Sequence, residues 1–347
     1  MNLTADTATA TKIRAKLGRR LKTADYDALM EQPTVGDAVA YLKHHTGYRE
    51  LFSNTNAAQI RRGQVETLLN KTIKRDFISL LKFNVSESRR FLRLFAIRDE
   101  IEKLKLLLRL LNSHHTENFA QDTNENLKKL RTVDFPSLAK ANDFASFIEL
   151  LRPTPYYKVL APFIHNEDQQ DVFNLEMALD MYYSRLSIAL MEKALRGKDK
   201  EIIAQTLGSE TDIKNITLIL RLKKYYNFPS EGIYPYIIPN YYKIRESHIR
   251  ALAESKSYEE AIEIVNRTVY KDALNIEDKF MEESLNEFIG NLHRKMFKAN
   301  PYTISAPVSY IHLKEIEVRN IVKIIEGIRY KMPANEIKKH IVGYNWR

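Results

Sequence analysis

The sequence predicts an all-α protein, and three observations lead to this prediction. Only ten Gly and eleven Pro interrupt 347 residues, although these two residue types mark most turns. Leu, Ile, Lys, Glu and Ala are abundant, which favours long helices over strands and turns. Similar stretches, each with the pattern of one amphipathic helix, occur at 99–109, 211–221 and 315–327. A chain of this length exceeds the roughly 250–300 residues of one hydrophobic core, so we expect it to be subdivided.

Three markers recur in the same order along the chain, as expected for internal repetition. The first is Thr-x-Tyr after a helical stretch, and its copies lie 108 and then 114 residues apart. The second is Glu-x-x-Leu, and the third is the acid that opens each amphipathic stretch, followed in two copies by Asn three residues later. The second and third markers are separated by 34, 36 and 35 residues. The marker residues are Thr46, Tyr48, Glu66, Leu69, Glu100, Thr154, Tyr156, Glu176, Leu179, Asp212, Asn215, Thr268, Tyr270, Glu282, Leu285, Glu317 and Asn320.

The markers predict three sequential homologous helical units of about 110 residues, at 1–115, 116–228 and 229–347. A Leu beside a Glu is more often an ordinary core edge than a repeat signature, so the fixed order and spacing carry this prediction. The polar stretch 113–129 and the Pro-rich stretch 227–242 would join the units. Three such units could stack as a solenoid or surround an axis as a pseudo-threefold funnel, and the sequence does not choose between these.

Each unit is expected to contain a small helical module followed by a long helix pair. In the first module, residues 23–48, Thr34 has the position of an N-cap and Asp37 that of its capping-box partner. The last long helix is expected to stop before Pro333. About 18 residues per long helix give arms of roughly 27 Å. The expected helix pairs are 64–83 with 86–111, 174–197 with 209–227, and 281–299 with 310–331.

The composition excludes some kinds of chemistry and indicates where in the cell the protein is expected. The chain has no Cys, which excludes disulfides, thiolate metal sites and Cys nucleophiles and fits a reducing cytoplasm. Its first twenty residues lack the apolar core of a secretory signal. The most apolar run, 104–111, is interrupted by Lys105 and Arg109 and is far shorter than the roughly 20 residues of a membrane span. We therefore expect a soluble or peripheral protein.

The net charge of +10 and the nineteen Tyr leave several interpretations open. The 44 acids are interspersed with 54 bases, as on ordinary solvated helix faces. General attraction to an acidic partner or to anionic lipid is an alternative, and we expect no specific binding of nucleic acid. The tyrosines could contact protein partners, fill helix boundaries or stack bases. The most clustered are Tyr182, Tyr183, Tyr225, Tyr226, Tyr234, Tyr236, Tyr241 and Tyr242.

No recognisable catalytic or cofactor motif is present. The only Gly-Lys pair, at 197–198, lacks the rest of a phosphate-binding loop. The adjacent His pairs at 44–45 and 114–115 do not have the His-x3-His spacing of a helical zinc site. Glu282 and Glu283 fit a helix edge better than a pair of catalytic carboxylates. We therefore expect no catalytic, cofactor-binding or metal-binding residues, and a protein that is not an enzyme.

Several of these stretches resemble one known family, the C subunit of bacterial and archaeal V-type (A/V-type) rotary ATPases, whose eukaryotic counterpart is called the d subunit. The resemblance covers residues 10–343 and includes the threefold repetition. Its most specific part runs from Glu317 to Ile337. The stretches that carry it are 23–48, 173–186, 209–225 and 313–341.

The resemblance implies an all-helical, pseudo-threefold funnel in the central stalk of the rotor. Such a protein would lie on the cytoplasmic face of the membrane, bind the proteolipid rotor ring and receive the end of the central shaft. It would couple the two during ATP-linked transport of H⁺ or Na⁺ and would have no catalytic residues. The chain departs from the family at 113–129 and 299–312. The alternative is a free-standing helical-repeat scaffold that binds RNA or protein.

Overall fold

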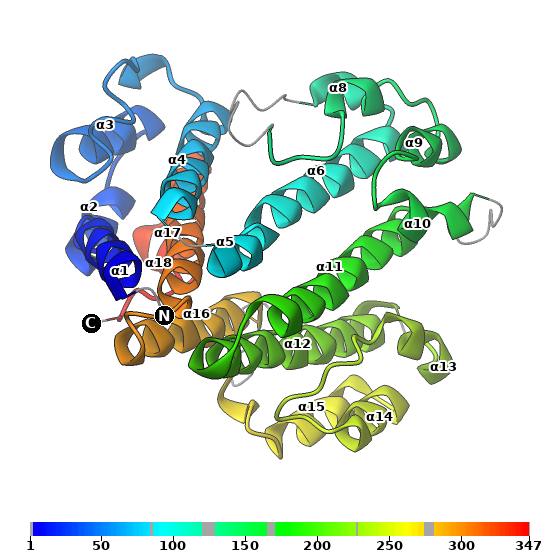
Figure 1. Ribbon diagram of the computed structural model, residues 1–347. Helices are drawn as coiled ribbons and strands as arrows, with labels where there is room; N and C mark the ends of the chain where they lie inside the picture. The colour runs from blue at the N-terminus through cyan, green and yellow to red at the C-terminus, as the bar shows by residue number, and fades with distance from the viewer. Residues whose placement is uncertain are drawn as a thin grey trace. The chain divides into compact units, whose positions relative to one another are not determined.

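The computed structural model describes residues 3–83, 86–119, 129–164, 171–226, 228–273 and 281–346. Every element in these ranges is an α-helix or a short 3-10 helix, so the predicted all-α class is confirmed (Figure 1). Among these helices, none has both the length and the apolar character needed to cross a bilayer.

The chain forms two compact units, neither of which is continuous in sequence. The first contains Met1–Val85, Gly197–Phe228 and Tyr241–Arg347, and the second contains Ser86–Arg196 and Pro229–Asn240. A compact unit is defined by contacts in space, whereas the predicted homologous units are defined by markers that recur in the sequence, so the two kinds of unit need not coincide. The predicted boundaries of the three homologous units therefore stay a prediction.

The first compact unit is organised around helix α17, which packs against α1, α2, α3, α4, α16 and α18. Leu29, Leu42, Phe52, Leu69 and Ile321 are fully buried in the core between α17 and the small helices. Burying one such side chain contributes roughly 1.5–3 kcal/mol. The helices of this unit are α1 (Leu3–Leu17), α2 (Thr23–Met30), α3 (Val35–His45), η1 (Ala57–Gln59), α4 (Arg62–Phe83), α12 (Gly197–Tyr226), α14 (Glu246–Glu254), α15 (Tyr258–Asn266), η6 (Lys271–Ala273), α16 (Met281–Ala299), α17 (Ser305–Arg329) and α18 (Ala334–Lys338).

The second compact unit is organised around the packing of α6 on α11. Its core contains Leu104, Leu108, Ile148, Leu160 and Leu175, which are all fully buried. Its helices are α5 (Ser86–Leu92), α6 (Leu94–Asn112), η2 (Thr116–Asn118), α8 (Phe135–Leu138), α9 (Phe144–Leu150), α10 (Tyr157–Leu160), η3 (Ala161–Phe163), α11 (Val172–Ala194), α13 (Ser230–Ile233) and η5 (Tyr234–Tyr236).

The N-cap of the first module is confirmed, and two later helices begin in the same way. The Thr34 hydroxyl accepts a hydrogen bond from the Asp37 N–H at 3.1 Å and donates one to the Asp37 carboxylate at 2.6 Å. At the start of α9, Asp143 accepts from the N–H three residues later at 2.7 Å. At the start of α15, Ser257 does the same at 3.2 Å. Each cap satisfies a backbone donor that the helix leaves open.

The long helices differ from the predicted ones in three places. The helix expected over 86–111 is two helices, with Arg93 between them. Arg93 keeps right-handed helical angles, and no Gly or Pro marks the interruption in the sequence. Helix α12 begins at Gly197 rather than 209, and α17 begins at Ser305 rather than 310, so much of the stretch 299–312, where the chain departs from the family, is helical. In the polar joint 113–129, residues 120–128 lie outside the described residues.

Two long helices end on a non-glycine residue in the left-handed conformation. Lys331 after α17 has φ of 54°, and His114 after α6 has φ of 56°. The Met332 N–H returns to the Gly327 carbonyl at 2.9 Å, which is the six-to-one hydrogen bond of a Schellman ending. Helix α17 therefore ends through this turn, before Pro333 is reached.

The substitution Lys331→Gly is expected to raise the free energy of unfolding by about 1 kcal/mol, because Gly adopts positive φ without a Cβ penalty. Urea unfolding followed by circular dichroism measures this change. Lys331→Ala is the control, since it removes the same side chain but keeps the Cβ. An equal gain in both variants would attribute the effect to the loss of the Lys side chain instead.

Candidate functional site

The three Thr-x-Tyr markers form the same local turn after a short helix. In each, the Thr hydroxyl donates to a backbone carbonyl three or four residues earlier, at 2.6–2.7 Å. The same hydroxyl accepts from the backbone N–H of the Tyr, at 3.1–3.3 Å. The turn fixes the chain where the helix ends and directs the Tyr side chain inward. Thr46 precedes Tyr48, Thr154 precedes Tyr156 and Thr268 precedes Tyr270.

Each of these tyrosines donates a hydrogen bond to a buried acid of the third marker. The tyrosines are 1–4% exposed and the acids 0–2% exposed. The acid of one predicted copy meets the Tyr of the next, and the acid of the third copy meets the Tyr of the first. The contacts are Tyr156 Oη to Glu100 Oε2 at 2.7 Å, Tyr270 Oη to Asp212 Oδ2 at 2.8 Å and Tyr48 Oη to Glu317 Oε1 at 2.7 Å.

Backbone N–H groups from a loop complete each of these three sites, which we call the acid–tyrosine clusters. Glu100 accepts from the N–H of Thr132 and Val133, at 2.6 and 2.8 Å. Asp212 accepts from three consecutive N–H groups of residues 242–244, at 2.8–3.1 Å. Glu317 accepts from the N–H of Leu21 at 2.9 Å. Each cluster therefore ties a long helix to a loop and to the Thr-x-Tyr turn.

The Glu317 cluster also carries compensating charge. Lys314 lies 2.7 Å and Arg20 lies 3.3 Å from the carboxylate of Glu317. Burial by itself would raise the pKa of Glu317, but Lys314 and Arg20, with hydrogen bonds from Lys314 and Tyr48, hold it below its usual value. Burial and the Glu317 charge raise the pKa of Tyr48. The carboxylate is therefore a charged acceptor and the phenol a neutral donor near neutral pH.

The second marker lies at a helix edge wherever its side chains are described. The Leu of each copy is buried, at 0–7% exposure. Glu66 pairs with Arg62 at 2.9 Å, and Glu176 accepts two hydrogen bonds from Arg109, at 2.5 and 2.9 Å. The side chain of Glu282 lies outside the described residues. The buried leucines are Leu69, Leu179 and Leu285.

Asn320 helps to fasten the carboxyl-terminal segment to the long helices of the first compact unit. Its side-chain amide exchanges two hydrogen bonds with the backbone of Val342, at 2.7 and 3.1 Å. Beyond it, the indole N–H of Trp346 donates to Glu287 of α16. A Cβ added to Gly290 would lie 2.7 Å from Trp346 Cζ2, so the indole covers this glycine. Asn215 of the second copy is also buried.

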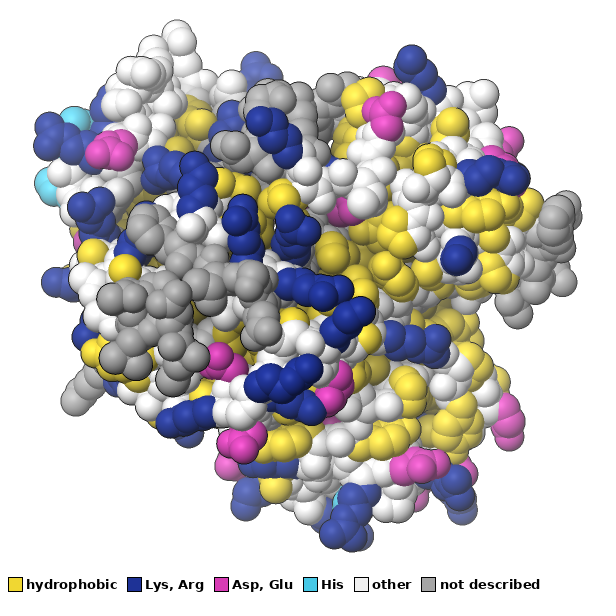
Figure 2. Space-filling model, in the orientation of Figure 1, with side chains coloured by type: hydrophobic (Ala, Val, Ile, Leu, Met, Phe, Trp, Pro, Cys, Tyr) yellow, Lys and Arg dark blue, Asp and Glu magenta, His cyan; other side chains and the backbone are white. Residues whose placement is uncertain are grey.

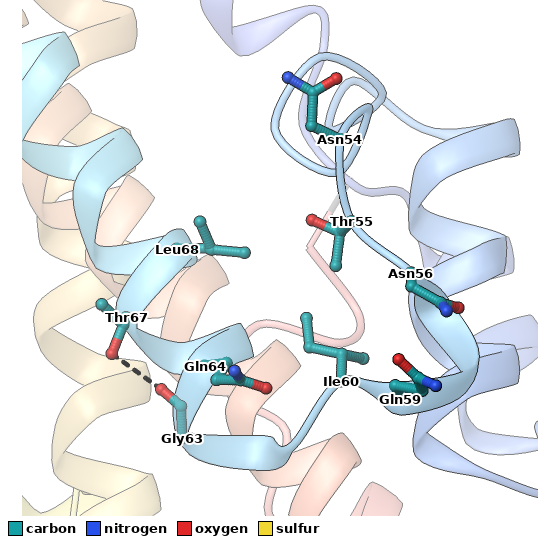
Figure 3. Close-up of a pocket in the computed structure, with 9 residues that line it drawn as sticks. All are labelled: Asn54, Thr55, Asn56, Gln59, Ile60, Gly63, Gln64, Thr67 and Leu68. Carbon is teal, nitrogen blue, oxygen red and sulfur yellow. Dashed lines mark hydrogen bonds between the residues drawn. The ribbon is translucent and has the colours of Figure 1, made fainter.

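An uncharged cleft of about 590 Å³ lies beside the first module (Figure 3). Gln59 projects from η1 and Gln64 from the start of α4, whereas the amide of Asn56 points away from α4 (Figure 3). Side-chain amides offer both donors and acceptors without charge, which suits a neutral polar partner such as peptide backbone. The cleft is lined by Asn54, Thr55, Asn56, Gln59, Ile60, Gly63, Gln64, Thr67 and Leu68.

A second hollow, of about 350 Å³, is basic and aromatic. Arg20, Lys22, Arg294 and Lys298 contribute to its wall together with Trp346. The Arg294 guanidinium lies 5.1 Å from the centre of the Trp346 ring, within the range of a cation–π contact. Burial, together with the nearby charge of Arg20, lowers the pKa of Arg294. The hollow therefore favours an anionic group of a partner.

The tyrosines that the sequence singled out are divided between surface and boundary positions. Tyr225 and Tyr226 at the end of α12 are 64% and 67% exposed. Tyr236 is half-buried and donates to Asn174 at 2.5 Å. The face shown in Figure 2 carries more Lys and Arg than Asp and Glu side chains, in agreement with the net charge of +10. The exposed rings of Tyr225 and Tyr226 therefore lie next to positive charge, whereas Tyr236 fills a helix boundary.

The acids and tyrosines of the clusters are closed to solvent and tie helices to loops, whereas Arg20 beside Glu317 also lines the basic hollow. The cleft and the basic hollow are open and can receive partner groups. The sequence pattern identified the marker residues but missed both hollows, because residues that are not periodic in the sequence line them.

Comparison with known proteins gives one consistent result. Residues 9–340 match the family described as ATP synthase (C/AC39) subunit. The chain is 23% identical over 344 residues to the C subunit of the A-type ATP synthase of Methanosphaera stadtmanae. This alignment covers 95% of this chain and 86% of the relative. It is 28% identical over 290 residues to the C subunit of the A-type ATP synthase of Methanosarcina acetivorans, which covers 80% and 76%. The protein of the same name from Methanobrevibacter smithii is 26% identical over 326 residues, with 90% and 81% covered.

The substitution Glu317→Gln is expected to lower the free energy of unfolding at pH 7 by roughly 3–5 kcal/mol, because it leaves Lys314 and Arg20 without their counter-charge. Since the pKa of Glu317 is lowered in the folded state, its contribution is present above the unfolded pKa and is lost as the pH falls through the folded value. The difference between variant and parent should therefore shrink below about pH 4. Urea titrations across this pH range measure it.

Glu326→Gln is the matched control on the same helix. Glu326 pairs with Arg62 at 3.3 Å, and its side chain is 40% exposed, so its loss should cost at most about 1 kcal/mol. Equal effects of the two substitutions would contradict the special role of the buried cluster.

The substitution Gly290→Ala is expected to displace Trp346 and to cost roughly 1–3 kcal/mol, because the new methyl group would also lie 2.9 Å from Ile316 Cδ1. Trp346 is the only Trp of the chain, so its fluorescence should shift to longer wavelength as the ring becomes hydrated. Gly63→Ala is the control, since nothing lies within 4 Å of its added Cβ. An unchanged spectrum in Gly290→Ala would place the indole elsewhere.

Proposed function

The chain belongs to the ATP synthase (C/AC39) subunit family, and we propose that it is a central-stalk rotor subunit that couples the central shaft to the proteolipid ring of the membrane. The match over residues 9–340 carries this proposal, because it spans nearly the whole chain. The family is that of a non-catalytic stalk subunit of a rotary ATPase. The work we propose is therefore mechanical, during ATP-linked movement of H⁺ or Na⁺.

The buried hydrogen bonds of the acid–tyrosine clusters support a mechanical role. A part that transmits torque must resist deformation when its two ends are loaded. Each acid–tyrosine cluster joins a long helix to a loop and a turn through buried hydrogen bonds. Such bonds are costly to break without replacement, because water does not reach the acid. The clusters therefore resist the sliding of small helices over long ones.

The surface supports docking on other subunits at the cytoplasmic face of the membrane. Exposed Tyr225 and Tyr226 lie beside Lys224, whose ammonium is 5.4 Å from the centre of the Tyr225 ring. Tyr and Arg are enriched in protein interfaces. A net charge of +10 attracts acidic residues of a shaft or an anionic membrane surface. A stable interface on each side would bury about 1,600 Å² in total.

We expect a tagged form to copurify with the shaft subunits and the proteolipid ring from gently solubilised membranes of the cell that makes it. The tag belongs at the amino end, since the carboxyl-terminal residues pack on α16 and α17. Mass spectrometry should find these partners in near-stoichiometric amounts. Washing with about 1 M salt shortens the Debye length to roughly 3 Å and should weaken the docking if positive charge contributes.

One result would contradict this proposal, and another would remove only the contribution of charge. Recovery from the soluble fraction, alone or with RNA, would favour the alternative of a free-standing helical-repeat scaffold. Recovery with the ring and shaft that does not change with salt would keep the rotor role and remove the contribution of charge.

A further inference from the structure

Two histidines and a glutamate from three helices meet inside the first compact unit. Glu210 of α12, His293 of α16 and His312 of α17 each offer one ligand atom, and these atoms lie within 4.8 Å of one another. His293 is 1% exposed, and the other two are half-buried. The two imidazole rings stack with their centres 4.1 Å apart. We propose that this trio binds a divalent transition metal ion, with Zn²⁺ as the ion that its ligands fit best.

The donor set is the first argument for zinc. Imidazole nitrogen and carboxylate oxygen are preferred ligands of Zn²⁺, and two His with one Glu leave a fourth position for water. Ca²⁺ and Mg²⁺ prefer an all-oxygen set, which the two imidazoles do not supply. The site therefore selects a borderline metal ion over the abundant hard cations.

The distances are the second argument. With metal–ligand bonds of about 2.0–2.2 Å, the donors of a tetrahedral zinc site lie roughly 3.4 Å apart. His293 Nε2 and Glu210 Oε1 are already 3.1 Å apart. The remaining donor pairs lie at most 4.8 Å apart, so they would have to approach by up to about 1.4 Å to reach that separation. To hold one ion, the stacked rings of His293 and His312 would have to turn so that a nitrogen lone pair of each points at it. The half-buried positions of Glu210 and His312 leave these two side chains as the ones that would move.

The environment of His293 is the third argument. Its Nδ1 lies 3.2 Å from Ser309 Oγ. A hydroxyl can donate or accept, so Ser309 can serve either tautomer of the ring. When Ser309 accepts from Nδ1–H, the lone pair of Nε2 faces Glu210 and is available to a metal ion. A hydrogen-bonded second nitrogen is the usual support of a metal-ligating His.

A metal ion bound by these three residues would link three helices, and this effect does not depend on the proposed rotor role. Helices α12, α16 and α17 pack on one another, and each contributes one ligand. Helix α17 carries the Glu317 cluster, and α12 carries the Asp212 cluster. One ion would therefore link the two long helices that bear these clusters to α16.

Isothermal titration calorimetry with ZnCl₂ on the metal-stripped full chain tests the proposal. We expect one site per chain, and a rise in the thermal midpoint of about 5 °C at a hundredfold excess over the dissociation constant. The variants Glu210→Gln and His312→Gln should weaken binding at least about tenfold. His340→Gln is the matched control, because His340 also contacts a carboxylate, that of Glu283 at 3.1 Å, but lies on a more exposed site.

Each outcome supports or overturns the metal site. Loss of zinc binding in Glu210→Gln and His312→Gln, with full binding in His340→Gln, supports it. If His312→Gln fails to fold by circular dichroism, Glu210→Gln decides, since its side chain is half-buried and its replacement keeps the shape. The absence of zinc binding, or binding that survives in both ligand variants, overturns the proposal and leaves the trio as a hydrogen-bonded cluster.

Discussion

The structure depends on satisfying buried carboxylates. A carboxylate without water is stable only when donors or positive charge surround it. The Glu100, Asp212 and Glu317 side chains meet this requirement in the same way, with one tyrosine hydroxyl and backbone N–H groups of a loop. The requirement fixes which loop and which turn must lie beside each long helix. The position of the small helices therefore follows from the chemistry of three acids.

The three clusters meet this requirement with different amounts of charge. Glu317 has Lys314 and Arg20 beside it, whereas Asp212 relies on three consecutive backbone N–H groups and a phenol. Backbone donors are held in place by the chain and require no second buried charge. The Glu317 cluster joins the last long helix to a loop 296 residues earlier in the chain. Its added positive charge compensates the buried carboxylate in this link between the two ends of the sequence.

The sequence predicted the helical class and the marker residues, because helices and turns both leave local patterns in a sequence. The spacing of Thr46 and Tyr48 shows a turn, and the acid with its following aliphatics shows a helix. Spacing does not show that Tyr48 meets Glu317 rather than Glu100, because only the tertiary fold brings these residues together. For the same reason the search for His-x3-His missed His293 and His312, which come from different helices and lie nineteen positions apart. The interruption at Arg93 left no Gly or Pro as a signal.

The same buried hydrogen bonds suit a subunit that transmits force, as in the proposed role. Packing of apolar side chains such as Leu42 and Ile321 in one core resists separation, and their interdigitation also opposes sliding, but the hydrophobic effect itself is non-directional. A hydrogen bond to a buried carboxylate is directional, and a shift of about one ångström breaks it. Each cluster therefore adds a directional constraint to the resistance that the packed core provides. Because the clusters recur on α6, α12 and α17, each of these long helices is held against sliding by its own set of buried donors.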